Sequence, residues 1–332
     1  MCVEGAVSAL RKMRIGTIQA ETGTKRFSYL KVGEISTSDV KLPVMIINGS
    51  KDGTTLALTA GIHGCEYSGI EAVIRIFNTI DPRKLRGRII AVPVVNTLAF
   101  QARTPYVCPI DGVNLNRIFP GDAEGSISHK IAHAVFYNVV SQADFVIDLH
   151  GADLPEELPP SGLVIVGSVG NKKVDSESQA LADLFDAEYI LMSKIEGSCT
   201  SEACKIGIPA IGPEAGGLGG RIEEKAVSFY TSGILNVMKY LKMIEGAPEK
   251  KRQKKKIVNL QMVRTRMGGI FYPKLKAGSE ISKGKTIGSV KSLKGSVLER
   301  ITASIDGIVF LRMTYTTVNT GDIVMILGEL ES

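Results

Sequence analysis

Two short motifs carry residue types that bind metal ions. His63 and Glu66 lie three residues apart in the segment HGCE, so one imidazole and one carboxylate can converge on a single ion. The pair alone is a weak signal, because His-x-x-Glu also occurs on ordinary surfaces. It gains weight from a second motif, Asp148-Leu-His150, which ends another apolar run.

The elements around these motifs would bring them to one edge of a sheet. An apolar run at 56–60 has the length of a strand, Gly61 interrupts it, and residues 67–80 show the apolar spacing of a helix. A strand, a tight loop and a helix start place side chains at the carboxyl end of a strand, where open α/β sheets keep their sites. The next apolar run, 87–96, suggests a parallel βαβ unit.

The rest of the chain predicts an α/β fold with a mixed, largely parallel sheet flanked by helices. We expect further strands at 14–30, 42–48, 145–149, 162–168, 188–192 and 208–212, with turns at 33–41 and 49–53. We expect further helices at 128–140, 175–186, 199–206 and 223–244. The long aperiodic stretch 97–125 is predicted to be a functional loop.

A change in composition predicts three regions: a catalytic domain at 1–246, a basic linker at 247–257 and an all-β domain at 258–332. The last region alternates apolar residues with glycine-containing turns. It resembles the barrel-sandwich fold of biotinyl and lipoyl domains. The turn that carries their modified lysine reads Ser304-Ile-Asp-Gly307 here, so the region is predicted to be structural or a lid.

Charge and cysteine content limit the classes of function. The 332 residues carry a net charge of +6, and the run 250–256 holds six basic residues, so the remainder is balanced. Such a run is more often a solvated linker than a site for nucleic acid or anionic lipid. No apolar run is long enough for a membrane span, and no signal peptide is recognised. Five scattered cysteines then indicate reduced thiols and a cytoplasmic location.

Four motifs in this order resemble the succinylglutamate desuccinylase/aspartoacylase family, which belongs with the zinc carboxypeptidases. They are His63-x-x-Glu66, Asn116-Arg117 within NLNRIFPG, Asp148-Leu-His150, and Glu214 within GPEAGG. Each motif is weak alone, but the order and spacing together are specific. The resemblance covers roughly residues 40–244, and the β region fits the family's C-terminal domain.

The resemblance implies one Zn²⁺ per chain, held by His63, Glu66 and His150. A catalytic zinc site commonly has three protein ligands and an open position for water, whose pKa the metal lowers toward ~7. The alternative for the two histidines is a capping or buried structural role. Cys65 could compete for a soft metal, although packing as a small apolar residue is favoured. Asp148 is either a support for a ligand imidazole or a buried structural group.

The resemblance also assigns catalytic and binding roles. Glu214 would be the general base and acid, Arg103 would stabilise the developing oxyanion, and Asn116 with Arg117 would grip a substrate carboxylate. The alternatives are a helix-start carboxylate for Glu214 and a loop salt bridge for Arg117.

One departure from the family bears on the substrate. Members that act on aspartate derivatives place an arginine in the helix before the catalytic glutamate, whereas this chain has Cys204 and Lys205 there. An N-acyl-aspartate substrate is therefore disfavoured, and the GPEAGG motif is closer to the branch that includes deacetylases of N-acetylated diamino acids.

The activity implied is zinc-dependent hydrolysis of the linear amide bond of an N-acyl amino acid or similar small amide. The alternatives are a metallocarboxypeptidase acting on peptides and a non-catalytic binding protein that kept the metal loop. The expected partner is a small molecule, with no nucleic acid or membrane, and homo-oligomerisation stays open.

Two further spacings could bind metal but are given ordinary roles. His129 and His133 are predicted to be plain helix residues, because no carboxylate motif accompanies them. Cys199 and Cys204 lack a second cysteine pair and are predicted to be core thiols.

Overall fold

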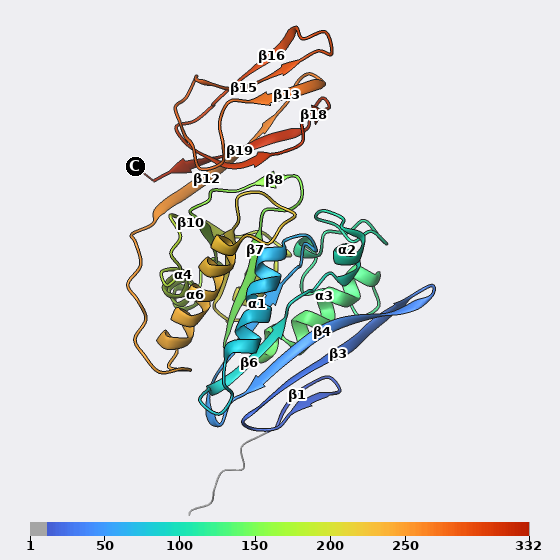
Figure 1. Cartoon of the computed structure of the whole chain (residues 1–332), viewed down its shortest axis with the longest axis vertical. Coiled ribbons are helices and arrows are strands. Elements are labelled where there is room, and N and C mark those ends of the chain that lie inside the picture. Colours follow the sequence, from blue (N-terminus) through green and yellow to red (C-terminus); the bar gives the residue numbers. More distant parts are fainter. Residues whose placement is uncertain (1–11, 332) are drawn as a thin grey trace, which may run out of the picture.

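A mixed sheet of thirteen strands runs through the molecule (Figure 1). The structure, a computed structural model, describes residues 12–331. At the centre of the sheet β5 (Lys51–Ala60), β6 (Arg86–Val92) and β7 (Phe145–Gly151) are parallel, and β11 (Ala210–Ala215) is parallel to β7. β9 is antiparallel to β11, so the sheet is mixed, as predicted. These central strands are buried on both faces, which accounts for their nearly continuous apolar sequences.

Most of the N-terminal strands form one side of this sheet, whereas the first two pair with each other in a separate two-stranded sheet. They are β1 (Met13–Ile15), β2 (Ile18–Ala20), β3 (Thr24–Ile35), β4 (Ser38–Asn48), β5 (Lys51–Ala60) and β6 (Arg86–Val92). The strand region predicted at 14–30 contains three strands that extend to Ile35, and the turns predicted at 33–41 and 49–53 are shorter, at 36–37 and 49–50. β3 and β4 form a long hairpin that turns between Ile35 and Ser38. β3 is an edge strand whose exposed and half-buried residues alternate, so its sequence lacks a continuous apolar run.

Helices cover both faces of the sheet. They are α1 (Tyr67–Thr79), α2 (Thr97–Ala102), α3 (Ile127–Asn138), α4 (Lys172–Ala182), α5 (Cys199–Lys205) and α6 (Glu224–Tyr240), with short 3₁₀ turns η1 (Leu115–Arg117) and η2 (Val140–Gln142). α1 and α6 pack side by side on one face, with a core built around Val73, Ile147 and Val237. α3 and α5 help to close the opposite core. The predicted 97–125 loop therefore contains α2 and η1.

Two central strands extend further than predicted. The strands that follow α3 are β7 (Phe145–Gly151), β8 (Glu156–Glu157), β9 (Leu163–Gly167), β10 (Tyr189–Ser193) and β11 (Ala210–Ala215). His150 and Glu214 are thus the last but one residues of β7 and β11, not loop residues beyond them. The hydrogen bonds of a sheet hold both backbones in place.

The C-terminal strands divide between the central sheet and a second, separate sheet. They are β12 (Lys255–Arg264), β13 (Gly269–Pro273), β14 (Glu280–Ile281), β15 (Thr286–Lys291), β16 (Val297–Thr302), β17 (Gly307–Met313), β18 (Thr317–Val318) and β19 (Ile323–Leu330). β12 begins before residue 258 and pairs in parallel with β10. β16, β15, β13 and β18 form a separate sheet, with a small core that includes Phe271, Ile287 and Val290. Figure 1 shows this region beyond the carboxyl ends of the central strands.

The basic run 250–256 lies against carboxylates of the same chain. Arg252 Nε is 2.9 Å from Asp186 Oδ1, and Lys256 Nζ is 3.2 Å from Glu331 Oε2. These ion pairs favour the interpretation of the run as a connecting segment. Within residues 12–331, no helix has the length and apolarity needed to span a membrane.

Candidate active site

Glycines shape the loop that presents the first motif. Gly61 has a φ of 62°, a left-handed conformation that suits glycine and turns the chain at the end of β5. Gly64 packs against α2 so closely that a Cβ atom there would lie 2.3 Å from the backbone nitrogen of Phe100. The loop then reaches Glu66, the residue before α1. The tight turn fixes where His63 and Glu66 point.

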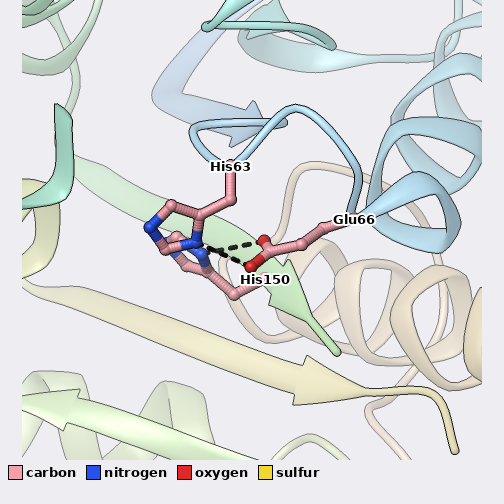
Figure 2. Close-up of side chains that lie close together, drawn as sticks. All are labelled: His63, Glu66 and His150. Carbon is pink, nitrogen blue, oxygen red and sulfur yellow. Dashed lines mark hydrogen bonds and ion pairs between the residues drawn. The ribbon is translucent and has the colours of Figure 1, made fainter. Parts of the chain in front are cut away.

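The side chains of His63, Glu66 and His150 converge, as Figure 2 shows. His63 Nδ1 is 2.7 Å from Glu66 Oε1, and His150 Nδ1 is 3.0 Å from Glu66 Oε2. One ligand atom from each residue lies within 4.8 Å of the others. Within the described chain, this is the group of His, Cys, Asp and Glu side chains placed to share one metal ion.

The outer nitrogen of each imidazole faces an oxygen acceptor. His150 Nε2 is 2.9 Å from Asp148 Oδ2, and His63 Nε2 is 3.3 Å from Asn114 Oδ1. Asp148 is in turn held by the hydroxyl of Thr59, which donates to its Oδ1 at 2.6 Å. With a proton on each Nε2, both Nδ1 lone pairs would face the Glu66 carboxylate, which is the arrangement that a shared metal ion needs. Two lone pairs and a carboxylate that face one another fit a shared cation.

Burial and charge act strongly on these groups. Burial opposes ionisation of Glu66, but His63 and His150 outweigh it and lower the pKa of that carboxyl. Burial likewise opposes protonation of His150, yet Asp148 and Glu66 raise its pKa well above the usual range. The same balance, with Glu66 as the main opposing charge, raises the pKa of His63. The buried cluster therefore favours positive charge beside Glu66, which either protons on the two imidazoles or a metal ion would supply.

Glu214 lies at the same edge of the sheet. It is paired in register with His150 across the parallel strands β11 and β7, and its side chain is half-buried. Burial raises its pKa to about 8, with Glu66 and Glu156 adding to the effect and His150 opposing it. A carboxylate with a raised pKa beside the cluster of His63, Glu66 and His150 suits proton transfer near neutral pH.

The three other predicted site residues occupy different positions. Arg117 is exposed, donates from Nη1 to the backbone oxygen of Asn116 at 2.7 Å, and is close enough to Glu214 for their charges to interact. Asn116 accepts from the backbone N–H of Cys199 at 3.0 Å and approaches His150 Nε2 at 3.3 Å. Arg103 is exposed, has a φ of 55° at the end of α2, and lines a surface groove beside the metal loop.

Sequence reasoning did not single out several neighbours of the cluster. Asn114 lies two residues before Asn116 in the NLNR motif, and this position could have marked it as a residue of the site. Tyr106 and Glu156 stand in segments without a recognisable motif. The Tyr106 hydroxyl donates to Glu156 Oε1 at 2.9 Å, and its ring centroid lies 6.2 Å from that of His63. Asp153 accepts from the backbone N–H of Tyr106 at 2.8 Å.

The cysteines and the remaining histidines take the ordinary roles predicted for them. Cys65, Cys199 and Cys204 are buried and free, while Cys2 lies outside the described residues. Burial raises the pKa of the Cys65 thiol to about 11, as expected of a packed cysteine. His129 is 3.0 Å from the Ser126 hydroxyl.

Lys205 does not replace the family arginine near the cluster. It pairs with Glu202 at 2.8 Å, and its side chain is 46% exposed. The helix before Glu214 therefore places this cation on the surface.

Comparisons with known proteins agree with the predicted resemblance. The succinylglutamate desuccinylase/aspartoacylase catalytic domain matches residues 52–241. The chain is 27% identical over 329 residues to the N-alpha-acetyl-L-2,4-diaminobutyric acid deacetylase of Halomonas elongata, with 95% of this chain and 94% of that protein covered.

Solved structures show the same fold. A succinylglutamate desuccinylase/aspartoacylase from Rhodobacter sphaeroides has a TM-score of 0.83 and 26% identity, covering 96% of this chain and all (100%) of that one. The product-bound ectoine utilization protein EutE (DoeB) from Ruegeria pomeroyi has a TM-score of 0.85 at 24% identity, covering 94% of this chain and 97% of that one. Because the family's catalytic domain matches more than half of the sequence, the chain belongs to the succinylglutamate desuccinylase/aspartoacylase family.

Proposed function

We propose that this protein is a zinc-dependent deacylase that hydrolyses the amide bond of an N-acyl amino acid. The observation that carries the proposal is the convergence of His63, Glu66 and His150 beside Glu214 at one edge of the sheet. The fold proposed with it is that of the zinc carboxypeptidases, followed by a barrel-sandwich-like β domain. We keep the predicted division at residues 246 and 258 as part of the proposal.

The donor set favours zinc as the metal. Two imidazoles and one carboxylate suit a catalytic zinc ion and leave room for a water molecule. When bound, the ion supplies a positive charge that lowers the pKa of a water molecule and polarises a carbonyl group. His63, Glu66 and His150 would hold it, and Asp148 and Asn114 would keep the two imidazoles oriented.

The remaining residues divide the work of the reaction. The Glu214 carboxylate would take a proton from the attacking water and give it to the departing amine nitrogen. Arg117, whose charge reaches Glu214, would bind a carboxylate of the substrate, with Asn116 beside it. Arg103 would stabilise the oxyanion, which requires its exposed side chain to turn from the surface groove toward the substrate.

The acidic character of the surroundings favours a substrate with an additional amine. Asp153 and Glu156 are close enough to Glu66 for their charges to interact. Burial and the charge of Glu66 raise the pKa of Asp153 and that of Glu156. A cationic amine on the substrate would relieve this repulsion. Together with the deacetylase among the relatives, this points to N-acetylated diamino acids as the first substrates to test.

The test is a screen of zinc-loaded protein against acetyl and succinyl derivatives of aspartate, glutamate and 2,4-diaminobutyrate, with release of the free amine as the measurement. We expect turnover of the diamino acid derivative and its loss in Glu214→Gln. Cleavage of peptides alone would instead establish the carboxypeptidase alternative. Zinc binding without turnover of either class would establish the binding-protein alternative.

A further inference from the structure

The C-terminal β region is bonded to the loop that follows Glu214 through one short strand. β8 lies in the segment that leaves the metal ligand His150, and one of its edges pairs with β17, with Glu157 opposite Arg312. Its other edge faces the glycine-rich segment 215–221, through the bridge between Glu157 and Leu218. β8 is therefore shared between the β region and the active-site wall.

Backbone contacts fix both edges of β8. On the side of the β region, the N–H of Thr314 donates to the oxygen of Pro155 at 2.8 Å. On the other side, the N–H of Gly219 donates to the oxygen of Glu156 at 3.1 Å, and the N–H of Leu158 donates to the oxygen of Gly217 at 3.0 Å. These bonds transmit the position of β17 to the segment that begins directly after Glu214.

The two loops of this junction pack closely at Gly219. A Cβ atom on Gly219 would lie 1.7 Å from the backbone oxygen of Asp153, so the two loops touch through their backbones. A shift of β8 must therefore move the segment 215–221 or break its hydrogen bonds.

A charge-assisted hydrogen bond between side chains also joins β8 to β17. Arg312 Nε donates to Glu157 Oε2 at 2.6 Å, and the same oxygen accepts from the N–H of Ala277 at 3.2 Å. The side chains are only 19% and 13% exposed, so solvent screens this pair weakly. Loss of the arginine would leave the Glu157 carboxylate half-buried without its counter-charge.

We propose that Arg312 is a positioning residue for Glu214, acting from the β region through Glu157 and β8. The inference rests on the proposed function for its kinetic consequence, but its structural consequence stands independently. The neighbouring Glu156 accepts a hydrogen bond from Tyr106, whose ring lies beside His63. A shift of β8 would therefore also displace Tyr106 on the His63 side of the site. The β region is by this inference a structural part of the active site.

The test compares Arg312→Met with Arg266→Met. Arg266 is the control, because it also pairs with a glutamate of the β region, Glu299, at 3.1 Å, and its described contacts do not involve β8. Hydrogen exchange of the backbone amides is measured in 152–158 and 215–221, with zinc content and kinetics on the same preparations. Arg312→Lys keeps the positive charge, so this variant should keep most of the wild-type exchange rates and activity.

In Arg312→Met we expect amide exchange of Leu158 and Gly219 to become about tenfold faster, because a buried charged hydrogen bond is lost. We also expect kcat to fall about 10- to 100-fold with zinc content unchanged, since a small misplacement of a catalytic group has this cost. Arg266→Met should change neither quantity.

Unchanged exchange in 215–221, or the same changes in Arg266→Met, would overturn the proposal. If Arg312→Met does not fold, Glu157→Gln provides the same comparison, since it keeps the acceptor for Ala277. If the wild-type protein hydrolyses no N-acyl amino acid, the proposed function fails, whereas the exchange measurement still decides whether Arg312 positions the segment after Glu214.

Discussion

The backbone directly after Glu214 and the backbone of His150 are joined by the hydroxyl of a single tyrosine. The two residues lie in register on β11 and β7, and the Tyr230 hydroxyl reaches both strand ends from α6. It accepts from the N–H of Ala215 at 2.7 Å and hydrogen-bonds to the backbone oxygen of His150. The proposed base and a proposed metal ligand are therefore held on one rigid frame.

Removing that hydroxyl should loosen the frame. Tyr230→Phe leaves the buried N–H of Ala215 without this partner, so we expect a loss of about 1–3 kcal/mol in the free energy of unfolding, together with a lower kcat. Tyr240→Phe is the control, because Tyr240 lies on the same helix and is 46% exposed. Urea unfolding and kinetics of both variants check the prediction, and equal stabilities would contradict it.

The sequence predicted the central part of the fold and the metal cluster because both depend on local signals. Apolar runs gave the central strands, and the residues at their ends gave His63, Glu66 and His150, which the structure brings together. The long β3–β4 hairpin was missed because an edge strand exposes alternate residues. The joining of β12 to β10 was missed because strand pairing between distant segments leaves no local pattern.

The supporting residues of the site could be predicted only in part. Asp148 lies two residues before His150, so its contact with that imidazole was within reach of the motif. Tyr106 and Glu156 meet through two irregular segments 50 residues apart, and their pairing depends on the fold around them. Arg312 belongs to the C-terminal β region, and no sequence motif indicates that this region contacts the segment next to the site.

The metal cluster makes a direct prediction for its ligands. Glu66→Ala or His150→Ala should lose the bound zinc, whereas the fold should persist, because the ligands sit at strand and loop ends outside the main core. His129→Ala is the control, since it removes an imidazole elsewhere. Elemental analysis of the purified variants checks this, and full zinc occupancy in both ligand variants would exclude the assigned site.

The acceptor behind His150 should tune zinc affinity without being a ligand. Asp148→Asn weakens the hold on the Nε2 proton, so we expect zinc affinity to fall about 10- to 100-fold. Asp144→Asn, directly before the same strand, changes a carboxylate that accepts only from the backbone N–H of Thr55 among the described contacts. Competition with a chelator measures both affinities, and an equal loss in the two variants would point to general destabilisation.

Substitutions of Arg117 and Arg103 should change different kinetic parameters. Arg117→Ala should chiefly raise KM, because it removes binding of a substrate carboxylate that is present in both ground and transition states. Arg103→Ala should chiefly lower kcat, because the charge it meets develops only in the transition state. Steady-state kinetics on the best N-acyl amino acid test this. The reverse pattern would exchange the two roles.

Glu214→Gln tests the proposed base directly. The amide keeps the size and shape of the side chain but cannot take up the proton of the attacking water. A general base contributes about 10²–10⁴ in rate, so kcat should fall by that factor. Zinc content should stay at the wild-type level, because the three residues of the cluster are complete without Glu214.

The control for this prediction is Glu224→Gln, which changes a surface carboxylate that pairs with Arg75 at 2.6 Å. Activity and zinc content are measured on the same preparation of each variant. An active Glu214→Gln enzyme would remove this residue from the mechanism, and a loss of zinc would make it a ligand. Because Glu214 shares its backbone frame with His150, only a variant that keeps zinc and folding while losing turnover separates the chemical role from the structural one.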